Sequence, residues 1–160
     1  MTFFKKNKQL LSACNGRCAP LSEIPDEAFS SGMLGEGVAL FPASGHFLSP
    51  VNGRVESIAE SLHAYTLRAD DGTELLLHIG VDTVTLKGEG FRALVSVGDN
   101  VRAGAPLAEA DLGLIANRGL STATALLITN PEEIEIIEQR YGSVTAGRDA
   151  VLSYRTVQKG

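Results

Sequence analysis

One short segment occurs twice in this chain, and this repeat restricts the fold more than any other feature. Residues 12–18, Ser-Ala-Cys-Asn-Gly-Arg-Cys, match residues 49–55, Ser-Pro-Val-Asn-Gly-Arg-Val, at an offset of 37, and Glu23 and Glu60 follow at the same offset. Asn-Gly favours a tight turn because both residues tolerate positive φ. A strand–turn–strand unit present twice predicts an all-β fold with two related halves.

Short strand signals bounded by turn residues continue beyond the repeat. Regularly spaced short strands indicate an antiparallel β-sandwich or barrel. Residues 97–107 follow a V-G-D-x-V-x-A-G-x-x-L pattern, which resembles the turns of barrel–sandwich hybrid folds with a duplicated hybrid motif. The predicted strands are Gly37–Phe41, Phe47–Ser49, Gly53–Ile58, His63–Ala69, Glu74–Ile79 and Phe91–Val95.

Two short helices and a closing strand complete the predicted fold. One helix spans residues 111–119, with Asp111 as its N-cap. The other spans about residues 130–140, because Pro131 suits the first helical position and two glutamates follow it. A last strand is predicted over residues 150–155.

Length and composition indicate one globular domain. The chain has 160 residues, of which 44% are hydrophobic and 21% charged. We assign residues 13–157 to the domain and residues 1–12 to an N-terminal tail or short amphipathic helix that allows peripheral membrane contact. No apolar run approaches the roughly 18 residues of a membrane span, and no signal peptide is recognisable, so we expect a cytoplasmic protein. A net charge of −5 argues against nucleic acid as a partner.

The two cysteines fall inside the repeat. Cys14 and Cys18 take the places of Val51 and Val55. We therefore expect them to be buried apolar strand residues, since two thiols are an incomplete zinc site and a disulfide is rare in a reducing compartment.

Two histidines are predicted to face each other across a hairpin. If residues 71–72 form the turn, His63 is the diagonal neighbour of His78, and a turn at residues 70–71 would place them directly opposite. Both registers put both rings on one face of the sheet. Two such imidazoles can hold a metal, perform acid–base chemistry or carry a phosphoryl group. The third histidine, His46, is expected to be a solvated residue of a surface turn.

The residues around His78 carry a family resemblance. Residues 77–84, Leu-His-Ile-Gly-Val-Asp-Thr-Val, and residues 86–91, Leu-Lys-Gly-Glu-Gly-Phe, resemble the phosphorylation-site signature of the glucose-type enzyme IIA domains of the bacterial phosphoenolpyruvate-dependent sugar phosphotransferase system. The resemblance runs from about residue 13 to residue 155. Further matching segments are residues 20–26, 33–39, 49–53, 63–64 and 142–147.

The resemblance implies a phosphoryl carrier. His78 would accept a phosphoryl group on Nε2 from the phosphocarrier protein HPr and pass it to a cysteine of a sugar-specific IIB domain. His63 would assist without being phosphorylated, and the hydroxyl of Ser61 would orient its ring. No cofactor would be required, and zinc would bind His63 and His78 only when a partner supplies a carboxylate.

The resemblance also implies a docking surface. Asp26 and Asp82 would face basic residues of the partner, HPr or the IIB domain. Whether the unphosphorylated protein also binds and regulates permeases or enzymes is left open. The transported sugar is left open. The apolar part of the surface would comprise Phe29, Met33, Leu34, Leu76 and Val84.

Two other classes of protein compete with this interpretation. A zinc-dependent hydrolase on a related barrel–sandwich fold would use clustered histidines, but it needs a third ligand and typically a His-x-His pair, which is absent. A biotinyl or lipoyl carrier needs a lysine at a hairpin tip in a specific context, and Lys87 between leucine and glycine does not provide it.

Overall fold

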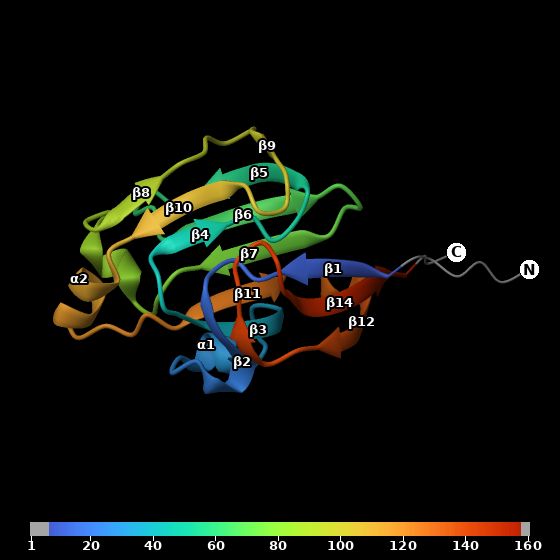
Figure 1. Ribbon diagram of the computed structural model, residues 1–160, viewed down its shortest axis with the longest axis horizontal. Coiled ribbons are helices and arrows are strands. Elements are labelled where there is room, and N and C mark those ends of the chain that lie inside the picture. The colour runs from blue at the N-terminus through green and yellow to red at the C-terminus, as the bar shows by residue number, and fades with distance from the viewer. Residues whose placement is uncertain (1–6, 158–160) are drawn as a thin grey trace, which may run out of the picture.

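The computed structural model describes residues 7–157 and consists mainly of antiparallel strands in one large and two small sheets (Figure 1). This architecture confirms the predicted all-β class. The eight-stranded sheet has, in spatial order, β13 (Gly142–Val144), β2 (Gly16–Pro20), β3 (Glu36–Pro42), β11 (Thr124–Ile128), β7 (Glu74–His78), β6 (Ala64–Ala69), β5 (Gly53–Ile58) and β9 (Asn100–Val101).

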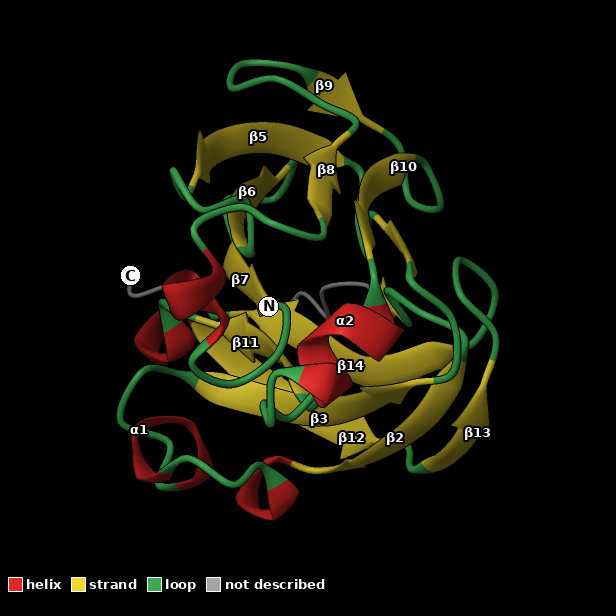
Figure 2. Ribbon diagram, turned by 90° about the vertical axis from the view of Figure 1, so that its left-hand side faces the viewer, coloured by secondary structure: helices red, strands yellow, loops and turns green. Residues whose placement is uncertain are grey.

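Two three-stranded sheets complete the fold, and the helices lie outside the strands (Figure 2). No helix in the described part of the chain is long and apolar enough to cross a membrane. One small sheet has the order β1 (Lys8–Leu11), β14 (Ala150–Thr156), β12 (Ile134–Gln139), and the other has the order β4 (His46–Leu48), β10 (Pro106–Ala110), β8 (Phe91–Ala93). The helical segments are α1 (Glu27–Ser30), α2 (Leu112–Asn117) and the 3-10 turns η1 (Leu21–Glu23), η2 (Thr83–Leu86) and η3 (Pro131–Glu133).

The repeated segment forms two equivalent structures. The large sheet reads β13-β2-β3-β11 from one edge and β9-β5-β6-β7 from the other, and the halves meet where β11 pairs with β7. In one copy the Ser12 hydroxyl donates to the Cys14 carbonyl at 2.7 Å, and in the other Ser49 donates to Val51 at the same distance. The two related halves predicted from the repeat are therefore present.

The glycine of each repeat is required by a close approach of two strands. A Cβ atom at Gly16 would meet the carbonyl oxygen of Phe41, and one at Gly53 would meet that of Arg68. Because backbone cannot yield as a flexible side chain does, glycine is needed at both positions.

The main core lies on one face of the large sheet. It includes Tyr65, Leu77 and Leu126, each no more than 1% exposed. Cys14 and Cys18 belong to this core, and burial raises the pKa of their thiols to about 12 and about 11. The prediction of buried, unpaired thiols is confirmed.

A smaller apolar cluster lies on the opposite face of the large sheet. Residues 21–35 and the loop after β7 supply its outer side. It packs on the strand residues that alternate with those of the main core. Its buried members are Ala19, Ile24, Phe29, Ala39, Val81, Ala123, Ala125 and Leu127.

Two predicted elements are wrong. The predicted helix over residues 130–140 is a 3-10 turn followed by strand β12, because the β-branched Ile134 and Ile136 favour a strand and β14 is available to pair with it. The predicted tail or helix over residues 1–12 contains β1, which pairs with β14. Residues 1–6 of that segment lie outside the described residues.

Most other predicted elements are confirmed. The strand over residues 53–58 has the predicted bounds, the one over residues 74–79 ends one residue earlier, and those over residues 37–41 and 47–49 differ by one residue at each end. The helix with Asp111 as N-cap is α2, in which Asp111 accepts a hydrogen bond from the Leu114 amide at 3.0 Å.

Candidate functional site

Two imidazole rings meet at one end of strands β6 and β7. His78 is the last residue of β7, and His63 immediately precedes β6. Their ring centroids lie 4.9 Å apart, and the ring planes are 82° apart, an edge-to-face arrangement. The structure therefore brings together the two histidines that hairpin pairing predicted to be neighbours.

The hairpin register differs from both predicted registers. Ala69 and Thr73 flank a three-residue turn, so His78 pairs with Ala64. The Asp71 carboxylate accepts a hydrogen bond from the Thr73 amide at 3.0 Å, and Gly72 has φ 92°, as three-residue hairpin turns require. Both predicted registers assumed a two-residue turn, and both are wrong.

The rings still meet because His63 lies outside the regular part of β6. It follows Leu62, which has φ 59°, a left-handed conformation that interrupts the pleat. The amide of Ile79 donates to the His63 carbonyl at 2.8 Å, which ties the two strand ends together. Strict alternation of side chains no longer applies at this end of the sheet.

The ring of His78 is held in one tautomer. Its Nδ1 lies 2.9 Å from the carbonyl oxygen of Gly80, which can only accept, so Nδ1 carries the proton and Nε2 keeps its lone pair. Burial lowers the pKa of His78 from its ordinary value of 6.5, and nearby His63 lowers it further. The Gly80 carbonyl, Asp26 and Asp82 oppose this shift. The ring is thus neutral and nucleophilic near pH 7.

His63 is the more enclosed of the two residues, with 7% of its surface exposed. Burial lowers its pKa, and the backbone of Ser61 partly offsets this effect. Within residues 7–157 its buried Nδ1 finds no hydrogen-bond partner, so the Ser61 hydroxyl does not make the predicted contact in this structure.

Acidic and aromatic side chains surround His78. The Asp26 carboxylate accepts a hydrogen bond from the Ala28 amide at 2.9 Å and so caps α1. Asp82, exposed and with φ 60°, immediately precedes η2. The ring of Phe29 lies 4.8 Å from that of His78 between centroids, at 52°. The carboxylates place negative charge beside the ring, as the prediction of a basic partner requires.

The five apolar residues predicted for docking divide into two groups. Met33, Val84 and Leu34 are 79%, 52% and 44% exposed. Phe29 is only 7% exposed, and Leu76 is partly buried against the smaller cluster. Three of the five residues are therefore exposed and two are buried or half-buried, and their part in docking stays a prediction.

Sequence reasoning missed two groups in the loop after β7. One is the Gly80 carbonyl, which selects the tautomer of His78. The other is Thr83, which is fully buried and donates its hydroxyl to the Ile79 carbonyl at 2.6 Å. A threonine within a glycine-rich loop is the one sequence signal that points to it.

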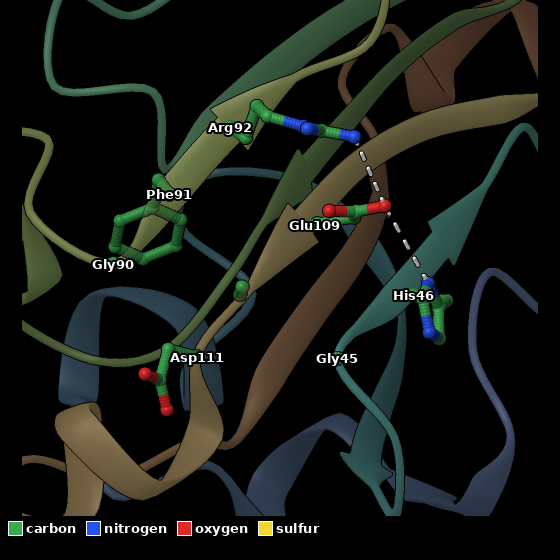
Figure 3. Close-up of a pocket in the computed structure, with 8 residues that line it drawn as sticks. Gly45, His46, Gly90, Phe91, Arg92, Glu109 and Asp111 are labelled. Atoms are coloured by element: carbon green, nitrogen blue, oxygen red, sulfur yellow. Dashed lines mark hydrogen bonds and ion pairs between the residues drawn. The ribbon is translucent and has the colours of Figure 1, made fainter.

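A separate concavity of about 390 Å³ lies between β4, β8 and β10. His46 and Arg92 both approach the Glu109 carboxylate, at 3.9 and 3.4 Å (Figure 3). His46 begins β4 rather than lying in a turn, but its side chain is 73% exposed. None of the predicted site residues lines this concavity.

Metal binding by the chain itself would need at least a third ligand beside the histidine pair. Among residues 7–157, no three His, Cys, Asp or Glu side chains form a group that could hold a metal ion.

Comparisons with known proteins agree on one family. Residues 8–134 match the family described as phosphoenolpyruvate-dependent sugar phosphotransferase system, EIIA 1. The chain is 38% identical over 148 residues to the glucose-specific EIIA component of Oceanobacillus iheyensis, covering 92% of this chain and 90% of that protein. It is 35% identical over 155 residues to the glucose-specific EIIA component of Haemophilus influenzae, covering 94% and 93%.

A longer relative and a solved structure extend this result. The chain is 44% identical over 132 residues to the glucose-specific EIICBA component of Staphylococcus saprophyticus, covering 82% of this chain and 20% of that protein. Glucose permease IIA from Mycoplasma capricolum superposes with a TM-score of 0.89 at 36% identity and covers 96% of this chain and 99% of its own. A zinc-dependent hydrolase receives no support from these relatives. The chain therefore belongs to the EIIA 1 family of the phosphoenolpyruvate-dependent sugar phosphotransferase system, and it is a phosphoryl carrier of that system.

Proposed function

We propose that Nε2 of His78 carries the phosphoryl group. The observation that supports this most directly is the hydrogen bond from Nδ1 to the Gly80 carbonyl, which leaves Nε2 unprotonated. Burial and His63 lower the pKa of the ring, so the nucleophilic neutral form predominates near pH 7. Exposure of the surrounding apolar side chains gives a partner access to this end of the sheet.

The reaction consists of two phosphoryl transfers. In the first, Nε2 attacks phosphorus as the bond to the phosphohistidine nitrogen of HPr breaks. In the second, the Nε2–P bond breaks as a cysteine thiolate of the IIB domain attacks. Catalysis of such steps depends mainly on positioning and on offsetting charge, because the phosphoryl oxygens carry the developing charge. His63, in ring contact with His78, would donate a hydrogen bond to those oxygens.

HPr and the IIB domain would use the same docking surface in turn. Met33, Leu34 and Val84 offer exposed apolar contacts, and Asp26 and Asp82 offer charges complementary to a basic rim. Phe29 and Leu76 would contribute through the base of this surface. Regulated permeases or enzymes that bind the unphosphorylated protein would compete for it.

Relatives and the known chemistry of the system direct the choice of partners. The matched EIIA components are named glucose-specific, so a glucose-type IIB domain is the first acceptor to test. HPr places the reaction in the cytoplasm. No cofactor is needed for either transfer, and His63 and His78 would supply two of four zinc ligands only beside a carboxylate of a partner.

Ser61 has a supporting role in this proposal. It lies two residues before His63, whose Nδ1 is buried and unpartnered within the described residues. A turn of the Ser61 hydroxyl toward that atom would satisfy it and fix the ring during transfer.

Phosphoryl transfer from phosphoenolpyruvate through Enzyme I and HPr tests the proposal. The wild-type chain should become labelled, and peptide mapping should locate the phosphoryl group on His78. The His46→Ala variant, altered at a distant exposed histidine, should be labelled equally well. Labelling of the His78→Ala variant would overturn the assignment. Adding a IIB domain should then discharge the labelled wild-type chain.

A further inference from the structure

Two hydrogen bonds hold the backbone on both sides of Gly80. The carbonyl of Ile79, on the preceding peptide group, accepts from the Thr83 hydroxyl at 2.6 Å. The amide of Val81, on the following peptide group, donates to the Ser121 carbonyl at 3.0 Å. Because both peptide planes are anchored, Gly80 is kept at φ 77° with its carbonyl directed at Nδ1 of His78.

Thr83 uses both branches of its side chain at this point. It is fully buried at the start of η2, and its hydroxyl donates to the Ile79 carbonyl. Its methyl group lies against Gly80, because a Cβ atom built on Gly80 would meet Thr83 Cγ2. The hydroxyl thus fixes one peptide plane, while the methyl group fills the space beside the glycine.

We propose that Thr83 is a positioning residue for phosphoryl transfer. Through the Ile79 carbonyl it holds the Gly80 carbonyl against Nδ1 of His78, and it thereby keeps the proton on Nδ1 and the lone pair on Nε2. Thr83 touches neither the phosphoryl group nor a partner in this scheme. The inference rests on the proposed role of His78 as the phosphoryl acceptor.

Loss of the hydroxyl would release one of the two anchors. The Ile79 carbonyl would lose its partner, and the Gly80 peptide groups would no longer be held in a single orientation. Nδ1 of His78 would then spend part of its time without an acceptor, and the neutral ring could carry its proton on either nitrogen. Rings protonated on Nε2 cannot attack phosphorus through that atom.

The test compares four variants of the full chain. Thr83→Val keeps the shape and removes the hydroxyl, whereas Thr83→Ser keeps the hydroxyl and removes the methyl group. Thr83→Ala removes both. Thr85→Val is the matched control, because Thr85 lies in the same turn and donates its hydroxyl to the exposed Asp82 carbonyl instead.

The main measurement is the tautomer of His78, read from its ring nitrogen chemical shifts in the unphosphorylated protein without any phosphoryl donor. Wild type, Thr83→Ser and Thr85→Val should show Nδ1 protonated. Thr83→Val and Thr83→Ala should show a mixture of tautomers. Phosphoryl acceptance from HPr should fall severalfold in Thr83→Val and Thr83→Ala, in proportion to the share of rings protonated on Nε2. It should match wild type in Thr83→Ser and Thr85→Val.

The Ser and Ala variants keep the test decisive if Thr83→Val does not fold. They lack the same methyl group and differ only in the hydroxyl, so any loss of packing is common to both. Identical tautomers and identical rates in these two variants would overturn the role of Thr83. If wild type were phosphorylated elsewhere than on His78, the proposed function would fail, and the tautomer comparison would still decide the question about Thr83.

Discussion

The two halves of the large sheet have the same strand pattern but different connections at their ends. Gly16 of β2 pairs with Pro42 of β3, as Gly53 of β5 pairs with Ala69 of β6. Counting along the strands from these pairs, Gly37 corresponds to Ala64. The partner of Gly37 is Leu127 and that of Ala64 is His78, so Leu127 occupies the position of His78.

The equivalent positions have opposite surroundings. Leu127 is fully buried in the smaller apolar cluster, which residues 21–35 help to cover. His78 is flanked by the short turn over residues 59–63, which leaves its ring partly accessible. The same counting places Glu36 at the position of His63. The repeated strands therefore form a common frame, and the connections between them decide which end can react.

The largest expected effect is that of replacing His63, whose counterpart in the other half is Glu36. The His63→Gln variant should still accept a phosphoryl group from HPr, because Nε2 of His78 is untouched. Onward transfer to the IIB domain should fall about a hundredfold or more, since a donor to the phosphoryl oxygens is lost. Single-turnover discharge of the labelled protein measures this.

Glu36→Gln is the matched control for His63→Gln, because Glu36 is exposed and lies at the equivalent position of the other half. Its discharge should match wild type. An equal loss in both variants would show that the two ends do not differ in function.

Reciprocal exchanges should have unequal effects on stability. Leu127→His should lower the free energy of unfolding by about 3 kcal/mol, because it places an imidazole without a hydrogen-bond partner in an apolar cluster. His78→Leu should cost no more than about 1 kcal/mol, since position 78 is only partly buried and lies beside the ring of Phe29, and it should accept no phosphoryl group. Urea unfolding measures both, and equal losses would contradict the comparison.

Acidification should lower the stability of the fold through the histidine pair. The folded-state pKa values of His63 and His78 lie below the ordinary value of 6.5, so the unfolded chain binds more protons in the window beneath that value. Stability should therefore be fully present above pH 6.5 and should decline as the pH falls below it. Urea midpoints at a series of pH values measure this decline.

The double variant His63→Gln/His78→Leu, measured over the same series of pH values, shows how much of the loss of stability the histidine pair causes. It should lose less stability between neutral and acidic pH than wild type. His46→Gln, altered at an exposed histidine, should follow the wild-type curve. A double variant as acid-sensitive as wild type would show that other groups cause the decline.

The smallest expected effect is at the cysteines. Cys14→Val and Cys18→Val should change the free energy of unfolding by no more than about 1 kcal/mol, because Val51 and Val55 fill the equivalent buried positions. Cys18→Ser should cost about 1–3 kcal/mol, since it buries a hydroxyl in the core. A larger loss for valine than for serine would mean that the two copies pack differently.

Patterns with a local physical cause could be predicted from sequence. The Asn-Gly repeat identified the two halves, and Asp111 correctly marked the start of α2. Where two local signals compete, the tertiary partner decides. Pro131 and the glutamates after it favour a helix, but Ile134 and Ile136 pair with β14 instead. The residues around Pro131 give no sign that β14, some twenty residues later, is available as a pairing partner.

The candidate site shows the same limit. His63 and His78 were predicted as neighbours, yet the register behind that prediction was wrong, because three-residue and two-residue turns are hard to distinguish from an Asp-Asp-Gly sequence. The Gly80 carbonyl was missed because every residue has a carbonyl, and only the folded loop shows which one faces Nδ1. The roles of His78, His63 and Ser61 in transfer stay predictions until they are measured.

The position of β11 between β3 and β7 also sets an order of events during synthesis. Ala125 pairs with His78, and Ser121 holds the loop after it, so the surroundings of the histidine are finished only by residues made some forty positions later. Until then β7, with Leu75, Leu76 and Leu77 in a row, has an open edge on a growing chain, a state prone to aggregation. The residues around His78 are therefore synthesised well before the strand and loop that surround them in the folded protein.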